Sequence, residues 1–590
     1  MKPLKFLTIL IILASSTSAF TDYIVKTSSG ITDGYKKGKV IYWDDIPYAK
    51  PPLGELRWKA PREIDNPNNL IKSKENNYCV QRPSSLGGPG GDGIFVGTED
   101  CLYMDISAPV KNKSELLPVM FWIHGGGNTS GLKDLYDFNK MVSRHNVIVV
   151  RVNYRLGPFG WFTHPAIQEY QTGLDKTSNF GTMDIIAALN WVQENIANFG
   201  GDSSNVTIFG ESAGGHNVFS LLVSSQSRGL FHKAIAMSGY TTSISPNDAY
   251  DQKKSSSTSS YTSSEIVKKI VNNKTVKNKD IRSILLNLST EEFFKYYSQR
   301  KTYEELPLLT SDGIVIPEVG LKQALYRKDL VNQVPTIAGS NRDEVKLWLA
   351  SAEYFVSLEF SPVGSVLSIP KVKLKDEDAF EAFSYYRSSA WKIRGVDIPL
   401  KGLHESGNNN LYAYRYDWDD HRRYIVADFK KLIGAAHATE IPLLAGNAKL
   451  VGGYPLSDLI YPAGISKRFT SRNMMRFWSN FAKYGKPGES TNSVKWNSVF
   501  ENQELGFSYI ILDNRNNLKI NTDSKSFKSL AQELYLDTRV NDLEKCVILL
   551  QMFTFVGNDL YDENIQFYPG KCDRSKSENF LIENASFIEY

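Results

Sequence analysis

The chain has few cysteines and histidines and no excess of either charge. Four cysteines in 590 residues exclude a small disulfide scaffold. Lys and Arg total 68 against 64 for Asp and Glu, so there are no electrostatic grounds for nucleic-acid binding. Hydrophobic residues make up 42% and aromatics 12%. This composition excludes a disordered or collagenous chain and is sufficient for a large globular core.

The apolar run at the start of the chain is too short to cross a bilayer, which needs about 20 apolar residues. Lys2 and Lys5 flank the start of this run, which covers 6–14, and small residues follow it up to Ala19. This order is typical of a secretory signal peptide at 1–19. We expect one mature domain over 20–590 with no membrane span. It is expected to be secreted and extracellular, or to lie in the lumen of the secretory or endolysosomal pathway.

Two further features accord with export. An even number of cysteines in a secreted chain indicates two disulfides, and the nearest-neighbour pairing, one of three, joins Cys79 to Cys101 and Cys546 to Cys572. Asn-x-Ser/Thr sequons are the second feature: the candidate glycosylation sites are Asn112, Asn273, Asn287 and Asn584, and further sequons begin at Asn128 and Asn205.

The Ser/Thr/Lys-rich stretch 253–264 predicts a flexible surface insertion.

Short, continuous apolar runs predict buried strands, and a helical pattern over 183–198 separates two of them. Strands that are apolar throughout and alternate with helices are typical of a mostly parallel sheet with both faces covered. The sequence therefore predicts an α/β fold. The runs lie at 119–123, 147–152, 206–209, 233–237, 335–339 and 411–416.

The sequence Gly210-Glu211-Ser212-Ala213-Gly214 directly follows the run 206–209, and a helix-compatible stretch follows it. A strand, a tight glycine-flanked turn and a helix form the context of a nucleophile elbow. The serine then lies at a helix N-terminus, which favours developing negative charge. Ser212 is therefore the candidate nucleophile.

His124-Gly125-Gly126-Gly127 follows the run 119–123. Glycines let backbone N–H groups approach a reacting carbonyl oxygen closely. This loop, with the N–H of Ala213, predicts an oxyanion hole.

A serine nucleophile needs a base and an acid. When the serine lies on a nucleophile elbow, the acid follows it along the chain and the histidine follows the acid. His437 is the favoured base because small residues surround it. His232 comes too early, His404 precedes a polar loop, and His421 lies in a charged run that predicts a solvated surface. The acid candidates are Asp312, in a turn-like segment, and Asp343 and Glu344 after the run 335–339.

The whole mature chain resembles the type-B carboxylesterase and cholinesterase group of α/β-hydrolases. Three segments carry the resemblance: 46–54, 99–106 (Glu-Asp-Cys-Leu-Tyr-Met-Asp-Ile) and 199–215 around Ser212. It implies an α/β-hydrolase fold, a central mostly parallel sheet flanked by helices in a single large domain.

Position by position, the resemblance implies a Ser212–His437–Glu344 triad, with Glu344 chosen over Asp343. Glu211 matches a glutamate that stabilises the site electrostatically, and Ser238 matches a serine near the acid. The pairing of Cys79 with Cys101 also matches. The donors that the resemblance implies for the oxyanion hole are Gly126, Gly127 and Ala213.

The chain departs from the family pattern at three places. Asn128 replaces the usual aromatic residue after the three glycines, which is expected to alter the pocket wall and to leave its sequon unused. No tryptophan lies between Cys79 and Cys101, where cholinesterases hold choline. Cys546 lacks its usual family partner near 398–400 and is therefore expected to pair with Cys572.

These features together predict a secreted serine hydrolase that cleaves small-molecule carboxylic esters through an acyl-enzyme. They imply no metal and no organic cofactor. Two alternatives are a non-catalytic adhesion or storage protein on the same fold, which commonly lacks the nucleophile, and a lipase, which a large apolar lid would favour.

Overall fold

The computed structural model describes residues 23–84, 88–110, 115–251, 262–298, 308–359, 371–424, 427–448, 460–501, 507–522, 525–554 and 559–584. The expected signal peptide and Asn112 lie outside these residues, as does most of the expected insertion at 253–264. Of that insertion, Thr262 caps helix α7 (Ser263–Ile270), and Ser263 and Ser264 lie buried in its first turn.

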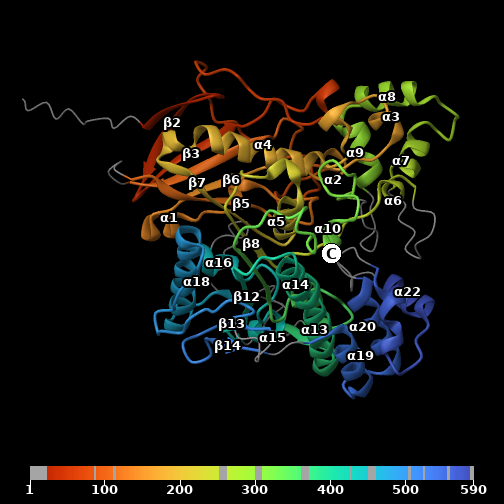
Figure 1. The fold of residues 1–590 in the computed structure, drawn as a ribbon. Coiled ribbons are helices and arrows are strands. Elements are labelled where there is room, and N and C mark those ends of the chain that lie inside the picture. Colours follow the sequence, from red (N-terminus) through yellow and green to blue (C-terminus); the bar gives the residue numbers. More distant parts are fainter. Residues whose placement is uncertain are drawn as a thin grey trace, which may run out of the picture.

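A twelve-stranded sheet forms the centre of the described molecule (Figure 1). Its order is β1-β2-β3-β4-β6-β5-β7-β8-β9-β12-β13-β14, and the run from β6 to β13 is parallel. The strands are β1 Tyr23–Thr27, β2 Gly30–Lys37, β3 Val40–Pro47, β4 Tyr103–Pro109, β5 Leu117–Ile123, β6 Ile148–Val152, β7 Gly201–Glu211, β8 Lys233–Met237, β9 Thr336–Asn341, β12 Leu411–Tyr416, β13 Tyr509–Leu512 and β14 Lys519–Asn521. The apolar runs in the sequence therefore mark the buried parallel strands, as predicted.

Successive side chains of each strand enter opposite layers of the core. In β5, Phe121 and Ile123 pack in one layer, while Met120 and Trp122 pack in the other. The first layer is covered by α4 (Phe180–Asn195) and α5 (Ala213–Val223), and the second by α1 (Asn139–His145), α16 (Ile441–Ala445) and α18 (Ile465–Tyr484).

Two helical groups extend the molecule beyond the sheet (Figure 1). The C-terminal helices α19 (Phe527–Leu536), α20 (Asp542–Thr554) and α22 (Arg574–Glu583) share a core with α13 (Glu377–Lys392). The helices α7, α8 (Asn278–Asn287) and α9 (Thr290–Ser298) pack around Trp58. The disulfides pair Cys79 with Cys101 and Cys546 with Cys572, as the sequence suggests.

Candidate active site

Ser212 lies in the sharp turn between β7 and α5, near the middle of the parallel run of strands. Its backbone has φ 59° and ψ −122°, a conformation that costs a non-glycine residue about 1–3 kcal/mol. Its N–H donates a hydrogen bond of 2.8 Å to the carbonyl of Met237 in β8. The side chain is only 6% exposed, so the turn holds a nearly buried hydroxyl.

The glycines around Ser212 allow this turn because neighbouring backbone lies where their side chains would be. A Cβ on Gly210 would be 2.6 Å from the carbonyl carbon of Gly214, and one on Gly215 would be 2.8 Å from the oxygen of Met237. A Cβ on Gly214 would overlap the carbonyl of Ile123 in β5. Each of these distances is shorter than real Cβ contacts, which explains the glycine pattern.

The loop His124–Gly127 lies directly against the serine turn. A Cβ on Gly125 would be 3.0 Å from the Cβ of Ser212. Gly126 and Gly127 have φ of 102° and 62°, which glycine adopts without strain. Among the described residues, the N–H groups of Gly126 and Gly127 donate to no other protein group. They are available to a ligand oxygen.

His437 and Glu344 form a close pair, although they come from separate loops. The Nδ1 of His437 lies 2.7 Å from Oε2 of Glu344, and the N–H of His437 donates to the carbonyl of Glu344 at 3.0 Å. Oε1 of Glu344 accepts a 2.7 Å hydrogen bond from the N–H of Asn341, at the end of β9. The carboxylate is fully buried and both of its oxygens are used.

The other ring nitrogen of His437 lies at the serine turn. Its Nε2 is 3.1 Å from Oε1 of Glu211, the residue before Ser212. Among the described residues, Ser212 Oγ donates no hydrogen bond to His437. The imidazole therefore contacts the residue before Ser212, and catalytic hydrogen bonds often tighten only in the complex.

Buried carboxylates set the protonation of this cluster. Burial opposes a charge on His437, but Glu211 and Glu344 outweigh it and raise its pKa to about 9. Burial, aided by the nearby charge of Glu344, raises the pKa of Glu211 to about 7. Glu440 is also fully buried and accepts a 2.6 Å hydrogen bond from Asn341 Nδ2. Burial, with the charges of Glu211 and Glu344, raises its pKa to about 8.

Three residues of this site were not predicted from the sequence. Besides Glu440, the indoles of Trp348 and Trp391 lie 5.2 and 4.8 Å from the imidazole of His437, measured between ring centroids. Trp391 also donates through Nε1 to the carbonyl of Ser238 at 3.2 Å. The sequence gives one weak signal: Trp348 and Glu440 lie within four residues of Glu344 and His437.

Ser238, expected near the acid, follows β8 with φ 46°. Its N–H donates a 2.7 Å hydrogen bond to the carbonyl of Gly339 in β9. Its buried hydroxyl has no hydrogen-bond partner among the described residues. Ser238 therefore joins neighbouring strands through its backbone and makes no hydrogen bond to Glu344.

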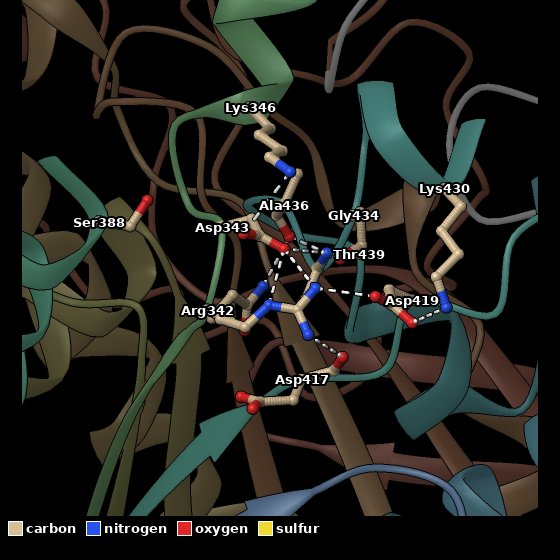
Figure 2. Close-up of polar contacts among 12 residues, drawn as sticks. Arg342, Asp343, Lys346, Ser388, Asp417, Asp419, Lys430, Gly434, Ala436 and Thr439 are labelled. Carbon is tan, nitrogen blue, oxygen red and sulfur yellow. Dashed lines mark hydrogen bonds and ion pairs between the residues drawn. The ribbon is translucent and has the colours of Figure 1, made fainter. Parts of the chain in front are cut away.

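Asp343, the neighbouring acid candidate, lies in an ion-pair network with Arg342 and Lys346 (Figure 2). Its Oδ2 accepts hydrogen bonds from the guanidinium of Arg342 at 2.7 and 3.0 Å and from the N–H of Ala435 at 2.9 Å. Burial opposes its charge, but Arg342 and Lys346 keep its pKa below the usual value. Asp343 thus fixes the loop that carries His437.

The remaining candidates have structural contacts elsewhere. Asp312 Oδ1 accepts from the N–H of Ile314 at 3.0 Å and of two residues beyond, which caps a turn. The ring of His404 stacks on Phe500, and His232 accepts from the N–H of Val206.

The expectation for His421 was wrong. The side chain is only 5% exposed, and its Nε2 lies 2.8 Å from the carbonyl of Gly434, next to the His437 loop. The charged run gave the wrong prediction because Asp419 and Asp420 are half-buried and pair with Lys430, while the imidazole itself is buried.

Asn128, which follows the three glycines, lies inside the protein. Its side chain is fully buried, and its Oδ1 accepts a 2.8 Å hydrogen bond from Asn217 Nδ2 in α5. Its side chain therefore contacts α5, the helix that follows Ser212. The Asn128 amide is inaccessible for glycosylation, whereas Asn273 and Asn287 are exposed and Asn584 is half-buried.

One acidic cluster has the composition of a metal site. Asp45, Asp105 and Asp134 lie within 4.8 Å of one another. The ammonium of Lys133 lies 2.8 Å from Asp45 and Asp105 and 3.0 Å from Asp134, and the lysine is fully buried. Lys133 supplies the positive charge that these carboxylates need, so they give no indication of a bound ion.

The chain shares its fold with solved esterases and its sequence with one protein family. The structure of the PNB esterase aligns with a TM-score of 0.65 and 27% identity, covering 86% of this chain and all of that one. The fold is therefore that of the α/β-hydrolases. The model of the carboxylesterase family matches residues 21–368 and 396–529. The chain belongs to the carboxylesterase family and is a carboxylic ester hydrolase.

Two characterised relatives span most of the chain. The para-nitrobenzyl esterase of Bacillus subtilis is 29% identical over 537 residues, which cover 86% of this chain and 98% of that protein. The liver carboxylesterase of Sus scrofa is 31% identical over 486 residues, covering 75% and 80%. No helix among the described residues is long and apolar enough to span a membrane.

Proposed function

We propose that the protein is exported and hydrolyses small, uncharged carboxylic esters through Ser212, His437 and Glu344. The observation that carries the triad is the 2.7 Å contact between His437 Nδ1 and Glu344 Oε2, with Nε2 directed to the turn that presents Ser212. Export is supported by the leader-like sequence, the sequons and the two disulfides.

In the first half of the reaction, Ser212 Oγ attacks the ester carbonyl and its proton passes to Nε2 of His437. The oxyanion accepts hydrogen bonds from the N–H groups of Gly126, Gly127 and Ala213, and one such donor is typically worth about 3 kcal/mol. His437 then gives the proton to the leaving alcohol, and an acyl-enzyme remains on Ser212.

In the second half, water attacks the acyl-enzyme while His437 takes its proton. Collapse of the tetrahedral intermediate releases the carboxylic acid and restores Ser212. Glu344 fixes the proton of the neutral imidazole on Nδ1, which leaves Nε2 as the acceptor, and stabilises the imidazolium. Near-complete burial of these groups strengthens each of the electrostatic contacts.

The test is labelling with a fluorophosphonate probe, followed by peptide mapping. We expect one adduct, on Ser212, and none in Ser212→Ala, which should keep the fold and lose hydrolysis of a panel of esters. Asp312→Asn is the control outside the site and should still label. Labelling of Ser212→Ala, or its undiminished hydrolysis, would disprove the assignment of the nucleophile.

Choline esters should be poor substrates. A quaternary ammonium is held chiefly by an aromatic face, worth about 2 kcal/mol when desolvated, which is about thirty-fold in kcat/KM. The loop between Cys79 and Cys101 has no tryptophan, and its Phe95 packs edge-on against Phe294, with ring centroids 6.1 Å apart. The test compares acetylcholine with its neutral tert-butyl analogue, and a clear preference for the choline ester would contradict this proposal.

A further inference from the structure

The glycine loop that would bind the oxyanion is fixed to the nucleophile's helix by a buried amide pair. Asn128, the residue after Gly127, accepts a 2.8 Å hydrogen bond at Oδ1 from Nδ2 of Asn217. Asn217 lies in α5, five residues after Ser212. Both asparagines are fully buried. One hydrogen bond therefore connects the two halves of the proposed oxyanion hole.

The backbone of Asn128 supports this role. Its φ of 57° is left-handed, a conformation that asparagine tolerates better than most residues. Its carbonyl accepts a 2.7 Å hydrogen bond from the N–H of Gly157, so the residue is held at both its main chain and its side chain.

The other end of the loop is held by Tyr154. Its hydroxyl donates a 2.8 Å hydrogen bond to the carbonyl of His124 and lies 3.4 Å from Oδ1 of Asn128. Tyr154 is fully buried and stacks on the ring of His124, with centroids 4.4 Å apart. Gly126 and Gly127 lie between these two fixed ends, and their N–H groups donate to no protein group in the described part of the chain.

We propose that Asn128 and Asn217 are positioning residues that hold the N–H groups of Gly126 and Gly127 in register with Ser212. Oxyanion donors act only when they lie at hydrogen-bond distance from the developing oxyanion. Small displacements of catalytic groups have large effects on rate. The amide pair connects this glycine-rich loop directly to the helix that follows the nucleophile. This inference rests on the proposed role of Ser212.

The experiment is a double-mutant cycle with Asn128→Gly, Asn217→Ala and the double variant. Glycine keeps the positive φ and removes the whole CH2–CONH2 side chain, including its hydrogen bond with Asn217. Enzyme is counted by titration to completion with a fluorophosphonate, and kcat, KM and the inhibition constant of a trifluoromethyl ketone, whose adduct carries an oxyanion, are measured. We expect each single change to lower kcat and weaken the ketone about tenfold with KM unchanged, since one hydrogen bond is worth about that factor.

The double variant should also lose about tenfold, because both changes remove the same contact. The matched control is Asn473→Ala. That buried asparagine in α18 accepts a 2.7 Å hydrogen bond from the N–H of Thr491, and its loss should lower stability without changing kcat or ketone affinity. Unchanged kcat in Asn217→Ala, or a hundredfold loss in the double variant, would overturn the inference. Absence of any label on Ser212 in the wild-type enzyme would instead refute the proposed nucleophile.

Discussion

The neighbouring acids Glu344 and Asp343 should respond to amide substitution in opposite ways. In Glu344→Gln, the side-chain carbonyl can serve either the N–H of Asn341 or Nδ1 of His437, which lie 2.7 Å from the two carboxylate oxygens. When the NH2 group faces Nδ1, the imidazole must carry its proton on Nε2. That tautomer cannot accept the proton of Ser212.

The magnitude follows from this loss of the correct tautomer and of the carboxylate that stabilises the imidazolium. Comparable amide replacement of a triad carboxylate costs about 10⁴ in kcat, or about 5.5 kcal/mol. The fold should tolerate the change because the amide is isosteric.

Asp343→Asn should instead weaken the fold. It removes the charge that Arg342 and the N–H of Ala435 share, and hydrogen bonds to charged groups contribute about 1.5–3 kcal/mol. We expect the free energy of unfolding to fall by about 2 kcal/mol and kcat of the folded enzyme to change by less than about threefold.

The assay combines denaturant unfolding, followed by tryptophan fluorescence, with kcat per titrated site. The reasoning fails if Asp343→Asn lowers kcat per site about a thousandfold while Glu344→Gln remains active, because the acid would then be Asp343.

Three other outcomes follow. His437 must be neutral to act as a base, and its pKa lies near 9, so kcat/KM should rise with pH up to about that value. Glu211→Gln should shift this rise to lower pH. A rise that stays at the same pH contradicts the electrostatic role of Glu211. N-terminal sequencing of exported protein should begin just after Ala19, and a chain that begins at Met1 would refute export by this leader. In a glycosylating host, peptide mapping should find glycan on Asn273 and none on the buried Asn128, and a glycan on Asn128 would contradict its burial.

Much of the fold could be predicted from the sequence because buried parallel strands are apolar on both faces. The run 411–416 is β12 itself, and 119–123 and 206–209 lie within β5 and β7. The elbow and the glycine loop were also predictable, since their function requires glycine at fixed positions beside a strand.

The surroundings of His437 could not be predicted because they come from distant parts of the chain. Trp391 arrives from α13, and nothing in its local sequence indicates an imidazole 4.8 Å away. Sequence reasoning also left Asp343 and Glu344 open, because their side chains leave the same turn in different directions. It misplaced His421, which is buried although Arg422 and Arg423 beside it are exposed.

The strained backbone that presents Ser212 for catalysis also lowers the stability of the protein. At φ 59° and ψ −122°, any residue with a Cβ destabilises the chain, and alanine is no better than serine. Glycine alone relieves the strain. An inactive Ser212→Gly protein should therefore outlast both the active enzyme and Ser212→Ala under heat or denaturant. If selection for ester hydrolysis were relaxed, selection for stability alone would favour glycine here, because one substitution relieves the strain.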